Sequence, residues 1–320
     1  MTIHIAVDIG GTRMRAASYP IDSLIPKASN RIKTRKKNST SIERLEQLIE
    51  SVWPEDDDVS AIGIAVPGPV NTAKGIIEKA PNIPELSGLQ VGRIMQDIFN
   101  VPTFLGNDAN FAALGEWKFG AGRGHHYVVY LTISTGIGSG VIINDQLFTG
   151  ATGFASELGH TLIDPSGPIC SCGVCGHLEA LASGTAISKW VTEQILSGAE
   201  TNIVFDSNSD EPIPGNIIAD AAKEGDALAI QVFERAGHFL GMAIADFLHI
   251  FNPTIIVLGG GVSQSYSLFS EVLYESMQSH VMAPEFLDNI TIELAQLGDD
   301  VGLMGALAYA REMTASIPDE

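Results

Sequence analysis

Cysteine and histidine residues gather in one short stretch of the chain. All three cysteines, Cys170, Cys172 and Cys175, lie within six positions, and His160 and His177 are close by. Thiolate and imidazole groups at this spacing are typical ligands of a tetrahedral structural zinc ion. A packing role is a poor alternative, because the stretch is rich in glycine and can form little core. The sequence therefore predicts His160, Cys170 and Cys172 as ligands, with Cys175 and His177 as alternatives for the fourth position.

Carboxylates supply a second kind of chemistry. Glu157 and Glu179 flank the cysteine stretch, and a carboxylate can accept two hydrogen bonds from neighbouring sugar hydroxyls. Asp108 follows a short extended run at 101–105 and precedes a predicted helix at 111–118. The positive end of that helix favours an ionised carboxylate, and strand ends are where open α/β sheets bind ligands. Asp108 is therefore a candidate general base for a substrate hydroxyl.

Three glycine-rich turns follow apolar runs and provide sites for phosphate groups. Glycine lets backbone amides approach a phosphate closely, and threonine hydroxyls add further donors. None of the turns is a Walker A loop or the dinucleotide fingerprint. Asp8 is placed to act as an outer-sphere partner of a nucleotide-bound Mg²⁺ ion. The residues are Asp8, Gly10, Gly11 and Thr12 in the first turn; Thr135, Gly136 and Gly138 in the second; and Gly259, Gly260 and Gly261 in the third.

Alternating apolar runs and amphipathic segments must position these residues. The basic stretch 31–37 is interpreted as a solvated edge strand rather than a binding patch. Thr40 and Glu43 form a capping box at the start of the first helix. Strands are predicted at 3–9, 13–19, 59–66, 127–134, 140–144 and 254–258, and helices at 42–52, 111–118, 178–196, 215–250 and 301–312.

The order of these elements predicts an α/β fold with two similar halves. Two strand hairpins, each turning on glycine and threonine, indicate a duplicated architecture. A length of 320 residues is compatible with two domains. The predicted domains are residues 1–106 with about 301–320, and residues 107–300 with the zinc site.

Composition excludes several classes of protein. The net charge is −20, which opposes broad contact with nucleic acid or an anionic membrane. No apolar stretch is long enough to cross a bilayer, and the first residues do not resemble a signal peptide. Cysteines confined to one cluster argue for a metal site in a reducing cytoplasm and against a disulfide framework. A cytoplasmic location is therefore expected.

Taken together, these motifs resemble the ROK family (repressor, open reading frame, kinase), and most closely its glucokinase branch. The resemblance covers nearly the whole chain, because the motifs occur in the family's order and approximate spacing. It implies an actin-like, ribonuclease-H-like ATPase fold of two α/β domains with a cleft that closes on sugar and ATP. It also implies Mg²⁺ and structural Zn²⁺ as cofactors, and a homodimer or homotetramer.

The resemblance also implies a role for each matching residue. Asp108 corresponds to the catalytic base that takes the proton of the sugar 6-hydroxyl. The first glycine turn, from Asp8 to Thr12, and the second, from Thr135 to Gly138, correspond to the family's two phosphate loops. The third glycine turn lies where adenosine binds. His160 is expected to bind zinc through one ring nitrogen and a sugar hydroxyl through the other. The implied sugar contacts are Gly68, Asn107, Glu157, His160 and Glu179.

The cysteine segment departs from the family pattern. The family usually has a cysteine where this chain has His177, and Cys175 occupies a position that does not normally bind metal. Because imidazole is a competent zinc ligand, the favoured set is His160, Cys170, Cys172 and His177, with Cys175 as the alternative.

Three functions are compatible with these motifs and with the family resemblance. The favoured one is ATP-dependent phosphorylation of glucose at its 6-hydroxyl. The same enzyme class could act on N-acetylmannosamine or another hexose or N-acetylhexosamine. A non-catalytic sugar sensor, such as a transcriptional repressor, is disfavoured by the charge and by the early start of the first strand.

Overall fold

The structure is a computed structural model and describes residues 1–80, 82–205 and 211–316. The chain divides into two compact units. The first contains Met1–His125, Gly140–Ser156 and residues 295–316, and the second contains His126–Ser139 and Glu157–Leu294. Residues 107–125 and 140–156 thus pack in the first unit, whereas the second domain was predicted over 107–300.

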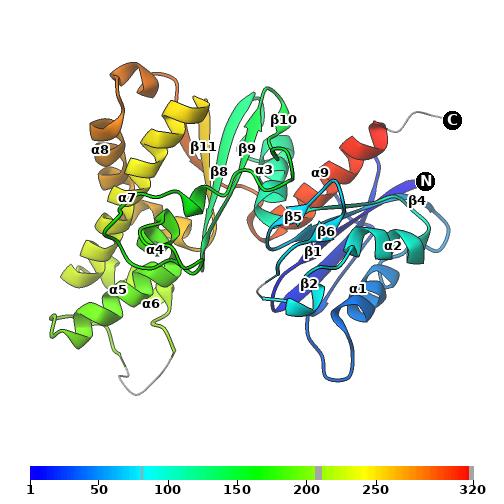
Figure 1. Ribbon diagram of the computed structural model, residues 1–320, viewed down its shortest axis with the longest axis horizontal. Helices are drawn as coiled ribbons and strands as arrows, with labels where there is room; N and C mark the ends of the chain where they lie inside the picture. Colours follow the sequence, from blue (N-terminus) through cyan, green and yellow to red (C-terminus); the bar gives the residue numbers. More distant parts are fainter. Residues whose placement is uncertain (81, 206–210, 317–320) are drawn as a thin grey trace. The chain divides into compact units, whose positions relative to one another are not determined.

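A five-stranded sheet forms the centre of the first unit (Figure 1). Its strand order is β3-β2-β1-β4-β7, in which β1 pairs antiparallel with β2 and parallel with β4. The parallel strands β1, β4 and β7 therefore end at the same edge. The strands are β1 Thr2–Ile9, β2 Arg13–Pro20, β3 Ala28–Lys33, β4 Asp58–Val66 and β7 Thr103–Asn107, with a separate two-stranded ribbon of β5 Val70–Asn71 and β6 Ile76–Ile77.

The two faces of this sheet differ in side-chain size. Alternation along β1 and β4 directs Ile and Val residues to the face covered by helices α1 (Ser41–Glu50) and α2 (Val91–Phe99). The opposite face carries Ala6 and Ala65, which pack against Leu303 and Leu307 of α9 (Val301–Ala315). At Gly63 a Cβ atom would lie 2.1 Å from the Ala306 carbonyl oxygen. Small residues therefore let α9 approach the sheet closely.

Local sequence signals explain where α1 and α3 begin. Thr40 accepts a hydrogen bond from the Glu43 amide, and the Glu43 side chain accepts one from the Thr40 amide, as predicted. Helix α3 (Asp108–Phe119) begins directly after β7, with Asn107 as its N-cap. The carboxylate of Asp108 therefore lies in the first turn of α3.

A second five-stranded sheet has the order β10-β9-β8-β11-β12. Strand β11 pairs parallel with both β8 and β12. Each five-stranded sheet thus places a hairpin at one edge and parallel strands beyond it, which agrees with the predicted duplication. The strands are β8 Tyr127–Ile133, β9 Ile137–Ile143, β10 Gln146–Leu147, β11 Ile255–Gly259 and β12 Thr291–Leu294.

Two long helices predicted from the sequence are each interrupted. The segment 178–196 forms α4 (Leu178–Ala182) and α5 (Gly184–Leu196), because the Ser183 side chain caps a new helix start. The segment 215–250 forms α6 (Gly215–Lys223) and α7 (Ala227–Phe251), where Asp226 is the N-cap. Helix α8 (Ser270–His280) packs beside α7 (Figure 1). Among the described helices, none combines the length and apolarity needed to cross a bilayer.

Candidate active site and metal centre

The turn after β1 carries the first predicted phosphate loop. Gly10, Gly11 and Thr12 join β1 to β2, and the Gly10 amide donates to the Arg13 carbonyl at 2.8 Å. Thr34 supports this turn with two hydrogen bonds. Its amide donates to the Thr12 carbonyl at 2.9 Å, and its hydroxyl donates to the Gly10 carbonyl at 2.5 Å.

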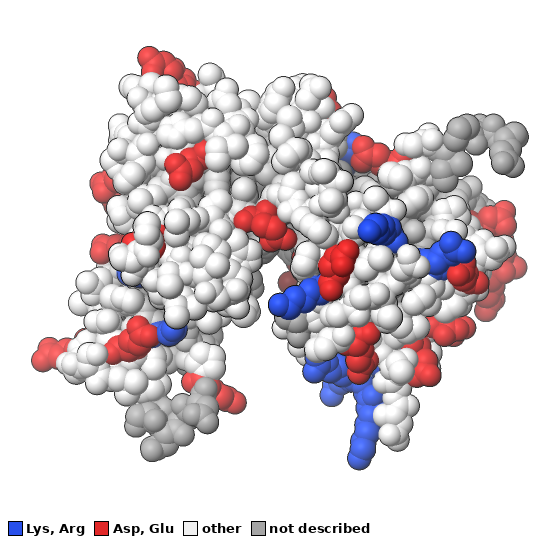
Figure 2. Space-filling view, viewed as in Figure 1, with Lys and Arg blue, Asp and Glu red and all other residues white. Residues whose placement is uncertain are grey.

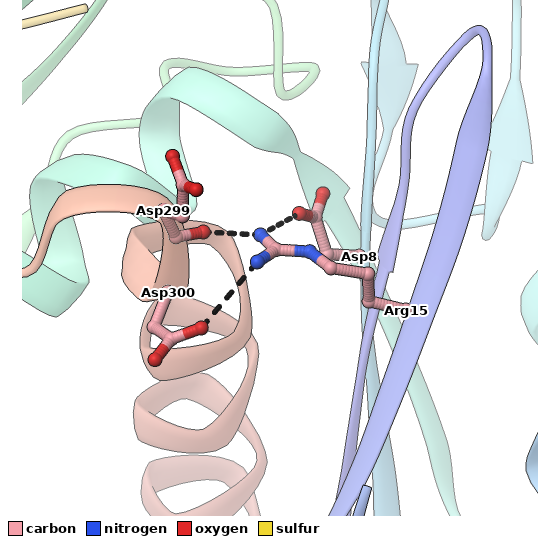
Figure 3. A network of polar contacts seen from close by, with 4 residues as sticks. All are labelled: Asp8, Arg15, Asp299 and Asp300. Atoms are coloured by element: carbon pink, nitrogen blue, oxygen red, sulfur yellow. Dashed lines mark hydrogen bonds and ion pairs between the residues drawn. The ribbon is translucent and has the colours of Figure 1, made fainter. Parts of the chain in front are cut away.

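Asp8 is held by an arginine that was not singled out from the sequence. Arg15 Nη2 lies 2.7 Å from Asp8 Oδ2, and both side chains are partly buried. The same guanidinium donates to the Asp299 carbonyl and contacts Asp300 Oδ1 at 3.4 Å (Figure 3). Asp8 and Arg15 are direct partners in the antiparallel register. Counting outward from the glycine turn would have found this pair, because directly opposed residues project to the same face.

Asn107 and Asp108 occupy the start of α3. Asn107 Oδ1 accepts hydrogen bonds from the amides of Ala109 and Asn110 at 2.9 and 3.0 Å. Its Nδ2 donates to the Gly68 carbonyl at 3.1 Å, so the structure brings two of the predicted sugar contacts together. Asp108 Oδ1 accepts from the Ala109 amide at 2.8 Å. A half-buried carboxylate at a helix N-terminus is well placed to stay ionised.

In the second unit, Glu179 joins the second glycine turn to the cysteine segment. Its Oε2 accepts the Ile137 amide at 3.1 Å, and a Cβ on Gly136 would lie 2.4 Å from the same oxygen. Its Oε1 accepts from Ser171 Oγ at 2.7 Å and from Cys170 Sγ at 3.4 Å. Burial alone would raise the pKa of Glu179, but these hydrogen bonds outweigh it and hold the pKa below its ordinary value.

The predicted metal ligands converge. One ligand atom each from His160, Cys170, Cys172 and His177 lies within 4.8 Å of the others. Cys170 Sγ is 3.6 Å from His160 Nδ1, and Cys172 Sγ is 3.2 Å from His177 Nδ1. Two thiols and two imidazoles at these separations fit a tetrahedral zinc ion. Cys175 is exposed and lies outside this group.

The remaining sugar-site candidate lies next to the metal group. Glu157 is exposed and immediately precedes the short 3₁₀ turn of Leu158–His160. The His160 amide donates to the Glu157 carbonyl at 3.0 Å. The side chain of Leu158 is buried and its amide donates to Ser139 Oγ, which ties the turn to the strand after the second glycine turn.

A pocket of about 560 Å³ opens in the second unit. Thr135 of the second glycine turn and Gly261 of the third both line it, and Gly259 and Gly260 directly precede Gly261. Its remaining walls come chiefly from α5, α6 and the segment after β11. The volume suits a nucleoside-sized ligand. Neither Gly136 nor Gly138 is among the lining residues.

Comparison with known proteins assigns a family to these features. Residues 4–313 match the model of the ROK family. The glucokinase of Thermotoga maritima is 34% identical over 310 residues, which span 96% of this chain and 97% of that protein. The xylose repressor of Caldicellulosiruptor bescii is 33% identical over 275 residues, covering 86% of this chain and 68% of that protein.

A solved structure supports the same relationship. The crystal structure of a ROK family glucokinase from Streptomyces griseus, in complex with glucose and AMPPNP, has a TM-score of 0.80 and 31% sequence identity. The similarity covers 97% of this chain and 99% of that one. The predicted actin-like, ribonuclease-H-like α/β fold is confirmed.

Proposed function

Because the chain belongs to the ROK family, we propose that it is an ATP-dependent hexokinase that phosphorylates the 6-hydroxyl of glucose. The observation that carries this proposal is the position of Asp108, whose carboxylate lies in the first turn of α3 at the end of a parallel strand. Relatives named glucokinase, at 31 to 34% identity, favour glucose as the sugar.

In the proposed reaction, Asp108 accepts the proton of the sugar 6-hydroxyl. The freed oxygen attacks the γ-phosphorus of ATP, the bond from that phosphorus to the bridging oxygen breaks, and ADP leaves. Such transition states are loose, so that most of the catalysis comes from positioning and from neutralising phosphate charge. The Ala109 amide and the N-terminus of α3 favour the ionised form of Asp108 that this step requires.

Asn107 positions the sugar side of this site. Its side chain bridges the first turn of α3 and the Gly68 carbonyl, so Asp108 and the Gly68 loop are held in one arrangement. A fixed arrangement of base and substrate loop is the main structural requirement for an efficient proton transfer.

The phosphate side of the site belongs to the glycine turns. The turns that begin at Gly10 and Thr135 would offer amides and hydroxyls to the phosphates, and the pocket beside Gly261 would hold the nucleoside. A bound Mg²⁺ ion would neutralise phosphate charge, and Asp8 stands at the end of β1 to bind its water ligands.

His160, Cys170, Cys172 and His177 would hold a zinc ion. The ion would order the loop that carries these residues and orient the free nitrogen of His160 toward a sugar hydroxyl. Because Glu179 hydrogen-bonds both Cys170 and Ser171, the same order would extend to this second sugar contact.

The test is ADP release, measured with Mg²⁺ and ATP on glucose, mannose, fructose, N-acetylglucosamine and N-acetylmannosamine. We expect turnover on glucose, and a drop in kcat of about 100-fold or more in Asp108→Asn, because general-base catalysis contributes at least that much. Asp97→Asn is the matched control, since Asp97 is exposed on α2 and pairs only with Arg93 among the described residues. Near-normal turnover in Asp108→Asn would remove Asp108 from its role.

The same assay separates the alternatives. Turnover mainly on an N-acetylhexosamine would keep the mechanism and change the substrate. No ADP release with any sugar, in protein that contains zinc, would favour a sugar-sensing function. The similarity to a xylose repressor is the observation that supports this alternative. A homodimer or homotetramer and a cytoplasmic location stay predictions.

A further inference from the structure

Basic side chains gather at the end of β3 and in the loop that joins it to α1. Residues 31–37 contain five of the 18 Lys and Arg residues in a chain whose net charge is −20. Figure 2 shows blue atoms at the edge of the first unit where this segment lies. The stretch was interpreted from the sequence as an edge strand, but β3 ends at Lys33. Lys36 therefore lies in the loop that follows.

An open groove of about 590 Å³ lies beside this segment. Two lysines and an arginine line it, together with one apolar and one amide side chain, and the lining includes no acidic residue. The lining residues are Ile32, Lys33, Lys36, Arg44 and Gln47.

Arg44 distinguishes this groove from an ordinary basic surface. It is only 6% exposed, yet no carboxylate within the described ranges forms an ion pair with it. Its one side-chain hydrogen bond in that part of the chain runs from Nε to the Lys33 carbonyl, at 2.6 Å. Nη1 and Nη2 form no hydrogen bond among the described residues and are not among the buried polar atoms that lack a partner, so solvent reaches both. The two terminal nitrogens of Arg44 are thus available to an anion in the groove.

We propose that this groove binds a small phosphate-type oxyanion, either inorganic phosphate or a phosphate monoester. A guanidinium fork matches two oxygens of a phosphate group, and Lys33 and Lys36 add positive charge at the open side. The surrounding charge of −20 acts against a long polyanion such as nucleic acid, whereas a small dianion needs only the local field of the groove.

The groove is connected to the first phosphate loop. Arg44 bonds the carbonyl of Lys33, and the next residue, Thr34, bonds the carbonyls of both Gly10 and Thr12. An anion that orders Arg44 and Lys33 would therefore also restrict the Gly10–Thr12 turn. This coupling makes the groove a regulatory site for the phosphate loop, and that part of the inference rests on the proposed function.

The binding test uses the full chain at constant ionic strength and needs no turnover, so its result is independent of the kinase proposal. Inorganic phosphate, glucose 6-phosphate and glucose are titrated separately while backbone amide signals are followed by ¹H–¹⁵N NMR. We expect saturable shifts at residues 32–36 and 44–47 with either phosphate compound and none with glucose. The tighter of the two compounds identifies the source of the phosphate group.

Variants assign these shifts to the groove. Lys33→Gln/Lys36→Gln should weaken the binding seen at residues 44–47 by about tenfold, since hydrogen bonds to charged groups are lost. Arg44→Gln should do the same, and the double lysine variant keeps the test valid if loss of the buried arginine impairs folding. Lys74→Gln is the matched control, because Lys74 is an exposed lysine of the same unit outside the groove. Shifts that do not saturate, or that persist unchanged in the double variant, would overturn the proposal.

A second readout in the same spectra tests the coupling. In the unmodified chain, the amides of residues 10–12 should shift with the same apparent Kd as those of residues 44–47. The double lysine variant should lose both responses together. A response at residues 10–12 that survives the double variant would show direct phosphate binding at the turn and would overturn the coupling.

Discussion

Asp8 and Arg15 face each other across the β1–β2 hairpin, and Asp300 reaches the same guanidinium from the start of α9. The Arg15 guanidinium therefore orients the carboxylate of Asp8. It also contacts the Asp299 carbonyl and the Asp300 carboxylate (Figure 3). Arg15 is therefore a positioning residue for Asp8, and its three contacts leave little of its charge for a nucleotide phosphate.

Replacing Arg15 tests this assignment. In Arg15→Gln, Asp8 keeps its charge but loses its orientation, and we expect kcat/KM for ATP to fall about tenfold, the usual scale for a lost hydrogen bond between charged groups. Steady-state kinetics at saturating sugar provide the measurement. Arg93→Gln is the control, because its ion pair with Asp97 is exposed. A loss confined to the sugar KM would contradict a role through Asp8.

His4 makes the stability of the first unit depend on pH. The side chain is almost fully buried in β1, contacts Ser60 Oγ at 3.3 Å through Nε2, and lies opposite Tyr19. Burial, with a smaller contribution from Arg311, lowers the pKa of His4 from 6.5 to about 4. Between these values the unfolded chain binds the proton and the folded chain does not, so stability falls as pH decreases through this window.

The expected loss of unfolding free energy from His4 is roughly 3 kcal/mol by pH 4. Urea denaturation of the unmodified chain and of His4→Asn at several pH values between 7 and 4.5 checks this expectation. The quantity to compare is the slope of the unfolding free energy against pH, not its absolute value. His249→Asn is the control, because His249 is exposed. Equal slopes in all three proteins would rule out His4 as the source.

At the scale of elements, α9 lies close to the first sheet because the strand residues that face it are small, with alanine at Ala6 and Ala65 and no side chain at Gly63. Gly63→Ala would bring a Cβ into the Ala306 backbone, and backbone cannot rotate away as a side chain can. We expect the free energy of unfolding to fall by about 1–3 kcal/mol, the usual cost of overpacking. Chemical denaturation compares this variant with Gly215→Ala, where a Cβ meets nothing within 4 Å. Similar losses in both would show that packing at Gly63 is not limiting.

The loop that carries the proposed metal ligands is the second element whose order can be tested. On the proposed zinc site, Cys172→Ser should lower the zinc content relative to the unmodified chain and raise the sugar KM more than the ATP KM. Cys175→Ser should keep both properties, because Cys175 lies outside the converging group. Metal analysis and kinetics of the two variants make the comparison. Zinc loss in the Cys175 variant instead would assign Cys175 as the fourth ligand.

Helix interruptions mark where periodicity reaches its limit as a predictor. Leu178 and Leu181 are buried one turn apart, as are Ile187 and Val191, but the six-residue step between the two pairs shifts the apolar face by about 240°, so the pattern carried a sign of the break at Ser183. The break after α6 left a clearer signal, since Asp226 is a good N-cap residue and follows a glycine. The hydrogen bond from the Ile137 amide to Glu179 could not be foreseen, because it joins residues that only the tertiary fold brings together.

For the molecule as a whole, the duplicated hairpin pattern and the fold class followed from the order of the glycine turns and apolar runs. The bounds of the two units did not follow from that order. Residues 107–125 look like the start of a new repeat, yet α3 packs on α9, where Glu116 accepts the amides of Gln296 and Leu297. A buried carboxylate that binds two distant backbone amides leaves no periodic trace in the sequence.

The small-residue face of the first sheet has a consequence for synthesis on the ribosome. Helix α9 covers strands formed by residues 2–66, but its own residues are made almost 200 positions after β7 ends. At about 5–20 residues per second, that interval lasts on the order of 10–40 s. Throughout it, the alanine face of the nascent sheet has no cover from α9. The strands of the first unit are thus synthesised early, and the helix that covers them is synthesised last. The alanine face is the surface that a chaperone would have to protect in the meantime.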